Sequence, residues 1–386
     1  MVAAKNYDAA VVGAGVFGAW TALQLARRGQ RVLLLDAYGP GHSRSSSGDE
    51  SRIIRMGYGA DEIYTQWSQR SLTKWKELFA ATHNESLFQN TGVLWMAAAG
   101  DPTLRAMREV LTRCGVKFRE FDRVALASKY SQIRLENIAE GIYEPESGVL
   151  MARRAVASVV AEAWRLGVDY RLSEVGPAGD TGRLSCVNCS NSGEPFSADQ
   201  FVFACGAWLG KIFPNILGQR IFVTRQAIFY FGIPAGDHRF SSPALPTWLI
   251  KNDECYGVPD LESRGLKIAL DKHGPSVDPD TQSRIVTPQE VDEIRQYVTR
   301  RFPALAEAPI VETRVCQYEN TSSGDFLIDR HPESSNVWFA GGGSGHGFKH
   351  GPVVGEYVAG LLLDGAKIES RFSFDNKETV QRRAIY

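Results

Sequence analysis

The first residues that could do chemistry are three glycines and an acid near the start of the chain. Gly13-x-Gly15-x-x-Gly18 lies between an apolar strand pattern and a helix-like stretch. Asp36 follows Gly13 by 23 residues, at the end of a second apolar strand. Glycines at this spacing permit a tight turn, a close approach of pyrophosphate to the backbone and helix-on-strand packing, and the acid suits a ribose hydroxyl. The pattern predicts a dinucleotide-binding βαβ unit, with FAD and NAD both open; a tight turn of another α/β fold is the alternative.

The other reactive side chains show no pattern of a metal or nucleophile site. Cys186 and Cys189 form a C-x-x-C pair, but no second pair or nearby histidine completes a zinc set. The histidines lack metal spacing, and GAWLG at 206–210 lacks the serine of a nucleophile elbow. We therefore predict no bound metal and no hydrolase chemistry. The sparse cysteines are expected to be mostly reduced thiols: Cys114, Cys186, Cys189, Cys205, Cys255 and Cys316.

Segments far apart in the sequence are expected to build the sheet that positions the glycine turn. Residues 148–172 are typical of a helix followed by a strand, and 200–213 of a buried strand that ends at Gly206. In 336–363 a buried strand opens onto the turn GGGSGHG, which would let a planar cofactor lie against backbone, and a helix follows. Residues 219–303 alternate apolar and polar positions in short runs, which indicates an antiparallel sheet of a second domain.

Composition and charge limit the classes of partner. The chain has 386 residues, enough for two or three domains, and 44% hydrophobic residues, as is typical of a globular protein. Its 43 Lys and Arg nearly cancel its 44 Asp and Glu, so no global field attracts nucleic acid or an anionic membrane. No run of 18 apolar residues, signal-peptide layout or C-terminal Ser-Lys-Leu occurs. We expect a cytoplasmic protein with no nucleic-acid or membrane partner.

Five segments occur together in an order that is far more specific than the glycine triplet. They are GAGVFG with Asp36, HSRSSSGDESRIIRMGYG at 42–59, ACGAW at 204–208, YGVPDLESRGLK at 256–267, and VCQYENTSSGDFLIDRHP with GGGSGHGFKHGP within 315–352. In these segments, which span essentially the whole chain, the sequence resembles the monomeric sarcosine oxidase group of the D-amino-acid-oxidase-like flavoproteins. The resemblance implies FAD as cofactor and an α/β fold of two domains.

The implied domains are a Rossmann-like FAD-binding domain, discontinuous in sequence, and a second domain on a mixed or antiparallel sheet. We expect residues 1–85, 146–217 and 309–386 in the FAD-binding domain, and residues 86–145 and 218–308 in the substrate-binding domain. A monomer is expected.

The resemblance also assigns roles around the flavin. It implies that Cys316 carries FAD through a thioether, which needs a thiol with cations nearby; a small buried thiol is the alternative. It implies that Lys267 lies over the flavin face and assists oxygen reduction, where a fixed cation would stabilise developing negative charge; a surface lysine is the alternative. Arg52 matches a basic residue that would tune the cofactor electrostatically.

The substrate pocket is implied in the same way. Arg55 and Lys349 match the pair that grips a substrate carboxylate, although either could be a solvated cation. Tyr256 and Tyr318 match pocket tyrosines, or are ordinary sheet aromatics. Asp271 stands where sarcosine oxidases carry a histidine and resembles the fructosyl-amine branch; it could equally contact a cationic group or face solvent.

Gly48 replaces a second histidine that lies near the flavin in the family. The predicted site therefore departs from a simple sarcosine pocket, and its residues fall into three groups. Catalytic roles are predicted for Lys267, Arg52, Tyr256 and Tyr318. Substrate-binding roles are predicted for Arg55, Lys349, Tyr256 and Asp271. Cofactor-binding roles are predicted for Gly13, Gly15, Val16, Phe17, Gly18, Asp36, Ser43, Arg44, Ser47, Arg52, Gly206, Trp208, Cys316, Gly343, Gly345, His346, Gly347 and Lys349.

The predicted reaction is oxidation of a secondary amine, an N-methyl or cyclic amino acid, by FAD. A hydride equivalent would pass to the flavin, O2 would become hydrogen peroxide, and the imine product would hydrolyse. Three alternatives remain: a fructosyl-amine (Amadori) oxidase of the same fold, a flavin dehydrogenase that uses another acceptor, and a flavin-binding protein without turnover.

Overall fold

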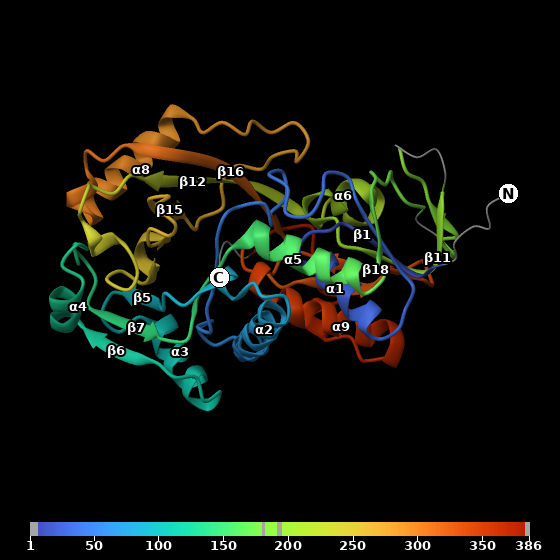
Figure 1. Cartoon of the computed structure of the whole chain (residues 1–386), viewed down its shortest axis with the longest axis horizontal. Coiled ribbons are helices and arrows are strands. Elements are labelled where there is room, and N and C mark those ends of the chain that lie inside the picture. The colour runs from blue at the N-terminus through green and yellow to red at the C-terminus, as the bar shows by residue number, and fades with distance from the viewer. Residues whose placement is uncertain (1–6, 180–181, 191–194, 383–386) are drawn as a thin grey trace.

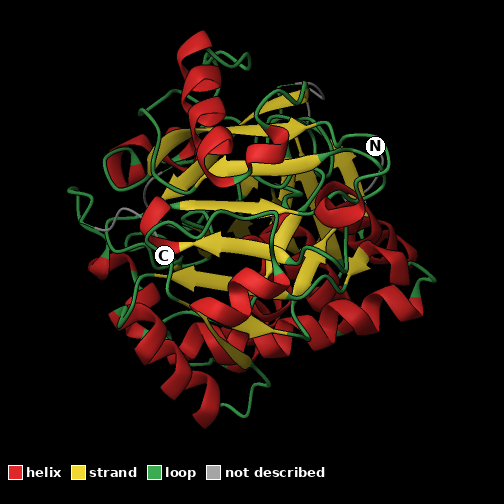
Figure 2. Ribbon diagram, turned by 90° about the vertical axis from the view of Figure 1, so that its left-hand side faces the viewer, coloured by secondary structure: helices red, strands yellow, loops and turns green. Residues whose placement is uncertain are grey.

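The structure of the chain is a computed structural model that describes residues 7–179, 182–190 and 195–382. Its strands form a seven-stranded sheet, an eight-stranded sheet and a small three-stranded sheet. Residues 1–6 and 383–386, at the outer ends of the predicted FAD-binding segments, lie outside the described residues, and so does the C-terminal tripeptide. Figure 2 shows the strands stacked through the middle of the molecule and the helices around its outside.

The seven-stranded sheet is the mostly parallel sheet that the glycine turn was expected to join. Its order is β17-β18-β11-β1-β2-β9, with β10 paired to β11, and only β10 and β17 are antiparallel to their described neighbours. Its strands are β1 (Tyr7–Val12), β2 (Val32–Asp36), β9 (Asp169–Leu172), β10 (Cys186–Val187), β11 (Phe196–Phe203), β17 (Leu327–Arg330) and β18 (Val337–Gly341).

Helices cover one face of this sheet, and α1 packs against the other two (Figure 1). They are α1 (Val16–Arg27), α5 (Ala152–Arg165) and α9 (Gly351–Asp364). Val11 and Leu34 join the core beneath these helices, whereas Val12 and Leu35 join a separate core on the opposite face. Burial of both faces explains why β1 and β2 are continuous apolar runs without polar alternation.

The eight-stranded sheet lies at the other end of the molecule (Figure 1). Its order is β16-β12-β15-β14-β13-β5-β7-β6, and every pair except β13 with β5 is antiparallel. Its strands are β5 (Val93–Ala97), β6 (Arg119–Asp122), β7 (Glu140–Glu144), β12 (Phe222–Phe231), β13 (Thr247–Ile250), β14 (Cys255–Val258), β15 (Leu266–Leu270) and β16 (Ile310–Asn320).

The two faces of this sheet differ. One face packs Trp248 and Phe231 into a core with α8 (Pro288–Arg301), a helix that begins at a capping box of Thr287 and Glu290. The other face is divided. Trp95, Leu249 and Val258 of β5, β13 and β14 join the large core that continues beneath α1. On β12, β15 and β16 this face carries a small apolar cluster of Ile228, Tyr230, Ala269 and Cys316, with Tyr256 beside it, and this part can present side chains to a ligand.

The remaining elements lie between the strands of the two large sheets. The three-stranded sheet has the order β3-β8-β4. The elements are β3 (Arg52–Ile54), β4 (Phe88–Gln89), β8 (Gly148–Leu150), α2 (Glu62–Ala81), α3 (Pro102–Arg113), α4 (Arg123–Lys129), α6 (Leu209–Ile212) and α7 (Pro214–Leu217). Short 3-10 helices complete the described chain: 85–87, 206–208, 238–240, 251–253, 303–305, 348–350, 370–372 and 374–376.

The predicted fold class, α/β with a discontinuous Rossmann-like unit and a mixed second sheet, is confirmed. The predicted domain borders stay a prediction. β16, which those borders group with the FAD-binding segments, pairs with β12 along the eight-stranded sheet before the chain returns to β17. Within the described residues, each helix is too short or too polar to cross a membrane.

Candidate active site

A cavity of about 310 Å³ opens at the carboxyl ends of the parallel strands. Val12, Asp36, Ala204 and Ala340, which end or follow β1, β2, β11 and β18, all contribute to its wall. Ligands of open α/β sheets bind at this edge of the sheet. We call this space the larger cavity.

The glycine turn at the larger cavity is closely packed on one side and open on the other. A Cβ on Gly18 would lie 1.8 Å from the carbonyl oxygen of Gly13, and a Cβ on Gly13, whose φ is +103°, would lie 2.3 Å from that of Ala204. On Gly15 the nearest atom would be the Ser47 hydroxyl, at 3.6 Å. Gly13 and Gly18 therefore bring helix and strand together, while Gly15 leaves room for a ligand at the start of α1.

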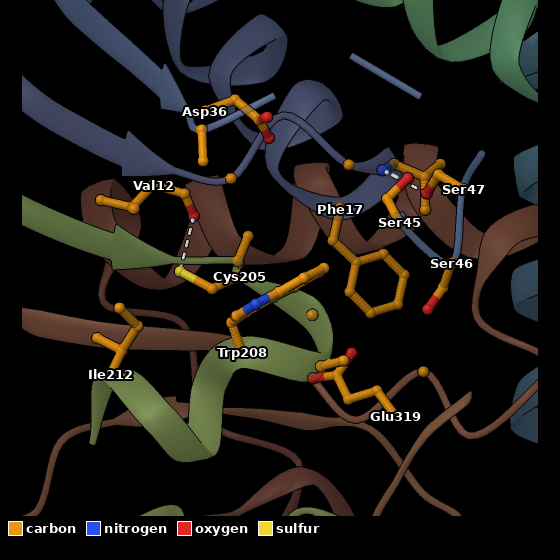
Figure 3. Close-up of a pocket in the computed structure, with 18 of the residues that line it drawn as sticks. Val12, Phe17, Asp36, Ser45, Ser46, Ser47, Cys205, Trp208, Ile212 and Glu319 are labelled. Carbon is orange, nitrogen blue, oxygen red and sulfur yellow. Dashed lines mark hydrogen bonds between the residues drawn. The ribbon is translucent and has the colours of Figure 1, made fainter. Parts of the chain in front are cut away.

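Asp36 closes this turn. Its carboxylate accepts hydrogen bonds from the backbone N–H groups of Ala14 (2.7 Å), Tyr38 (2.9 Å) and Gly39 (2.8 Å). Figure 3 shows Asp36 and Glu319 on opposite sides of the larger cavity, with Phe17 and Trp208 between them in that view. An acid fixed at the end of β2 suits a ribose hydroxyl, as the sequence predicted.

Glu319 is a buried acid in the wall of the larger cavity that the sequence did not single out. Its carboxylate accepts a 2.8 Å hydrogen bond from the Gly342 N–H. Burial raises the pKa of Glu319 to about 7, although hydrogen bonds from the Gly342 and Gly343 N–H groups act in the opposite direction. The side chain therefore keeps its proton to a higher pH than an ordinary glutamate does.

The residues of the larger cavity fit FAD. The open backbone at Gly15 and the positive end of α1 suit the pyrophosphate, and Asp36 suits the ribose. The wall continues from these residues to Arg52 and Tyr318, which also line a second space. An elongated dinucleotide would thus end beside that second space.

The second space is a smaller cavity of about 70 Å³. It shares part of its wall with the larger cavity, including Arg52, Tyr318 and Gly345. All four residues predicted to bind substrate line it: Arg55, Tyr256, Asp271 and Lys349. The structure therefore brings together the residue after β3, a residue of β14, the residue after β15 and a residue of the 3-10 helix 348–350.

Arg55 and Lys349 place two positive charges in the smaller cavity. Their exposed fractions are 5% and 4%. The Arg55 guanidinium lies over the rings of Tyr58 (4.3 Å) and Trp95 (4.7 Å) and donates to the Gly57 carbonyl. Within the described residues, neither cation forms an ion pair.

The contacts of Lys349 are to neutral groups. Its Nζ donates to the Tyr58 hydroxyl (2.9 Å) and the His346 carbonyl (3.0 Å). Burial and the charge of Arg55 hold the pKa of Lys349 well below its ordinary value, although Asp271 and Glu144 act in the opposite direction. A bound anion would relieve both penalties.

Asp271 and two tyrosines form another part of the wall. The Tyr318 hydroxyl donates to the Asp271 carboxylate at 3.5 Å. Burial raises the pKa of Asp271 to about 6, while the charges of Arg55 and Lys349 act in the opposite direction. Burial also raises the pKa of the Tyr256 hydroxyl, so both tyrosines stay neutral hydrogen-bonding groups at ordinary pH.

Cys316 lies on the same cavity beside a cation. Its Sγ is 3.3 Å from Nη2 of Arg52, which also donates to the Ser46 carbonyl at 2.8 Å. A cation this close to the sulfur is the arrangement that the resemblance implied for this cysteine. The predicted partners of a flavin thioether are thus together.

Lys267 lies behind Arg52, and its predicted role over the flavin stays a prediction. It is 2% exposed, lines neither cavity and forms an ion pair with the buried carboxylate of Asp49. Asp49 also pairs with Arg52. Burial alone would raise the pKa of Asp49, but the charges of Lys267 and Arg52 bring it well below its ordinary value.

Most of the predicted cofactor residues line one of the two cavities. Three others do not: Gly18 packs within the turn, and Ser43 and Arg44 are exposed. On the larger cavity lie Gly13, Gly15, Val16, Phe17, Asp36, Ser47, Arg52, Gly206, Trp208, Gly343, Gly345 and Gly347. On the smaller cavity lie Arg52, Cys316, Gly345, His346 and Lys349.

Sequence reasoning missed several residues that hold the site in place. Asp49 lies three residues before Arg52. The one feature of the sequence that could have marked it is that it is an acid among small polar residues. Glu144 accepts hydrogen bonds from the N–H groups of Met56 (2.6 Å) and Gly57 (3.0 Å) and so fixes the turn after Arg55. No local signal marks Glu144, because its partners are 87 and 88 residues away.

Comparisons with known proteins identify the family of the chain. The model of the FAD dependent oxidoreductase family matches residues 8–361. Monomeric sarcosine oxidase from Bacillus sp. (strain B-0618) is 32% identical, over 98% of this chain and 99% of that protein. Two solved structures share the fold at 21% identity. L-proline dehydrogenase from P. horikoshii has a TM-score of 0.82, covering 96% of this chain and 97% of that one. Fructosamine oxidase (Amadoriase II) from Aspergillus fumigatus has a TM-score of 0.81, covering 98% and 92%. The chain belongs to the FAD dependent oxidoreductase family.

Proposed function

We propose that the protein oxidises a secondary amine that carries a carboxylate, an N-methyl or cyclic amino acid, with FAD as cofactor and O2 as acceptor. The observation that carries this proposal is the pair of buried cations, Arg55 and Lys349, on the smaller cavity. Similarity to a monomeric sarcosine oxidase supports an amine substrate of this class.

The two buried cations would be stabilised by a bound anion. A charge removed from water without a partner is costly, and here two like charges share one small space. A substrate carboxylate would accept a forked pair of hydrogen bonds from Arg55 and a point-charge contact from Lys349. Because the cations are held by ring contacts and neutral hydrogen bonds, they are oriented before the substrate arrives.

The rest of the wall would orient the amine. Tyr256 and Tyr318 offer neutral hydroxyls and exclude water with their rings. With the carboxylate held at Arg55 and Lys349, the carbon next to nitrogen would face the shared wall between the two cavities. The protein would lower the activation barrier by positioning the substrate and by excluding water.

FAD, when bound, would accept a hydride equivalent from that carbon and pass two electrons to O2, giving hydrogen peroxide. The substrate becomes an imine, which water hydrolyses to an amine and a carbonyl compound. Cys316 would hold the cofactor covalently, and the support for this is its place on the smaller cavity, 3.3 Å from the Arg52 guanidinium. The monomeric state is a further part of this proposal.

A fructosyl-amine substrate is the second candidate, and Asp271 is the observation that favours it. This carboxyl lies on the smaller cavity with Gln226 and His273, so the wall is more polar than a simple N-methyl amino acid needs. A hydroxyl-rich group could hydrogen-bond there. The similar fold of a fructosamine oxidase agrees with this candidate without deciding for it.

The first test is the visible spectrum of the purified protein, measured again on pellet and supernatant after acid precipitation. Flavin bands that stay with the pellet are expected if Cys316 carries FAD. The Cys316→Ser variant should release the flavin into the supernatant. Folded protein that takes up no FAD on reconstitution would contradict the proposed function.

The second test is peroxide formation from matched amines. Sarcosine, other N-methyl amino acids and pipecolate should be oxidised, whereas dimethylamine, which lacks a carboxylate, should not. Fructosyl-glycine tests the second candidate in the same assay. Faster oxidation of dimethylamine than of sarcosine would overturn the role given to the two cations.

A further inference from the structure

The surroundings of Lys267 suggest a control on how the protein uses oxygen. Lys267 stands opposite Tyr230 in the pairing of β15 with β12, and it shares a sheet face with Ala269. This is the face that carries Cys316 and looks toward the smaller cavity. The ammonium group nevertheless lines neither cavity, because the polypeptide between Asp49 and Arg52 surrounds it.

Every hydrogen-bond donor of this ammonium is in use. Its Nζ pairs with the Asp49 carboxylate and donates to the Ser51 carbonyl at 2.9 Å and the Ser51 hydroxyl at 3.2 Å. An ammonium has three N–H bonds and accepts nothing. Lys267 can therefore reach a ligand in the cavity only if one of these bonds breaks.

Asp49 is shared between two cations. The same carboxylate pairs with the Arg52 guanidinium, and it also accepts from the Tyr230 hydroxyl (3.3 Å) and the Glu50 N–H (2.7 Å). Asp49, Lys267 and Arg52 together carry one net positive charge. Of the two cations, only Arg52 lines the cavities. Arg52 is thus the cation that a ligand would contact. The charge of Lys267 lies behind Arg52 and is balanced by Asp49.

We propose that Asp49 is a positioning residue that restrains the reaction with oxygen by anchoring Lys267 and cancelling its charge. The inference rests on the proposed function, in that it assumes FAD in the larger cavity. Reduction of O2 to hydrogen peroxide takes two electrons, supplied by the reduced cofactor, and two protons. Negative charge grows on O2 with the first electron, so net positive charge nearby speeds this step and a carboxylate that offsets part of that charge slows it.

Four proteins separate the charge of Asp49 from that of Lys267. The wild type and the double variant Asp49→Asn/Lys267→Met both keep one net positive charge in this group. In Asp49→Asn the group carries two net positive charges, and in Lys267→Met its net charge is zero. Glu50→Gln is the matched control, because this neighbouring acid pairs with Arg153 and Arg314 and lines neither cavity.

The oxygen reaction can be measured without any amine. Each protein is reduced with dithionite under nitrogen and mixed with oxygenated buffer, and the return of the oxidised flavin spectrum is timed. Asp49→Asn should reoxidise about tenfold faster or more than the wild type. Lys267→Met should be slower, the double variant should return close to the wild-type rate, and Glu50→Gln should stay within about twofold.

Sulfite binding supplies a readout that involves no turnover. Sulfite is an anion that adds to oxidised flavin and bleaches it, so its Kd reports the local charge. Affinity should be highest in Asp49→Asn, equal in the wild type and the double variant, and lowest in Lys267→Met. If Asp49 had only a structural role, Asp49→Asn would change thermal stability, but the sulfite affinities of the four proteins would not follow this order.

Three outcomes are decisive. Unchanged or slower reoxidation in Asp49→Asn with unchanged sulfite affinity would overturn the proposal. If Asp49→Asn does not fold, Lys267→Met and the double variant still differ only by the charge of Asp49, and equal rates and sulfite affinities in these two would overturn it as well. A protein that binds FAD but oxidises no amine would contradict the proposed function while both measurements still decide the role of Asp49.

Discussion

The two cavities are built in opposite ways. The larger cavity is shaped by backbone, with glycines whose missing side chains let helix, strand and loop approach each other. The smaller cavity is shaped by charged side chains from distant strands, Arg55, Lys349 and Asp271 among them. The first should therefore fail when atoms are added, and the second when charge is removed.

The largest effect is expected from one methyl group inside the glycine turn beside the larger cavity. In Gly18→Ala the new carbon would lie 1.8 Å from the Gly13 carbonyl oxygen, which is backbone and cannot move alone. We expect a loss of about 3 kcal/mol or more in the free energy of unfolding and no FAD binding. Chemical denaturation and flavin content after purification measure both.

Gly15→Ala is the matched comparison three residues earlier. Gly15 has an ordinary extended backbone, and its new methyl would meet only the Ser47 hydroxyl at 3.6 Å. This variant should fold as the wild type does and bind FAD at least about tenfold more weakly, because the methyl stands where the pyrophosphate approaches. If Gly18→Ala and Gly15→Ala were equally stable, the turn would not be closely packed at Gly18 and open at Gly15 as described.

The smaller cavity should lose activity while the fold survives. In Arg55→Met or Lys349→Met the substrate carboxylate loses one of its two cations. We expect kcat/KM for carboxylate-bearing amines to fall by a factor of about 100 to 10,000. Stopped-flow reduction of the flavin by substrate measures this loss, and flavin content should be unchanged in Arg55→Met.

Lys272→Met serves as the control for those two variants. Lys272 follows Asp271 directly, but its side chain is exposed and pairs with Glu293 on the surface. Its removal should leave kcat/KM within about twofold. A loss comparable to that of Arg55→Met would mean that general charge near the cavity, and not the buried pair, attracts the substrate.

The same contrast explains how far the sequence could predict the site. The glycine turn and Asp36 form within one βαβ unit, so their spacing predicts their geometry. Arg55 and Lys349 are nearly 300 residues apart, and only resemblance to a family could place them together.

The position of Lys267 could not be predicted at all from its local sequence. Its neighbours in β15 indicate an alternating strand, whereas its partner Asp49 belongs to the loop before β3, 218 residues away. Asp49 could be recognised only once the pairing of β15 and β12 placed that loop against the sheet. Buried ion pairs between distant segments are a property of the tertiary fold, which periodicity and spacing do not encode.

A smaller effect is expected from Glu319, the acid on the larger cavity. Its pKa is about 7 in the folded protein and near 4.5 in an unfolded chain, so the folded state binds more protons between these values. Stability therefore falls as pH rises from about 4.5 to 7.

Glu319→Gln should remove that pH dependence. In apoprotein prepared from a Cys316→Ser background, the Gln variant should melt a few degrees higher at pH 8 and no higher at pH 5. Thermal unfolding at both pH values measures the difference. A constant offset at the two pH values would show that Glu319 does not titrate in this range.

The smallest effect is expected from the titration of Asp271, which changes the charge of the smaller cavity. Its pKa of about 6 means that it is neutral below pH 6 and anionic above, where it weakens the attraction of Arg55 and Lys349 for an anion. Acetate, a carboxylate without an amine, should bind the wild type about three- to tenfold more tightly at pH 5.5 than at pH 8. In Asp271→Asn this dependence should vanish and the tighter value should hold at both pH values. Acetate binding followed by the flavin spectrum tests this without an amine that titrates, so a persisting dependence would assign the titration to Lys349 and not to Asp271.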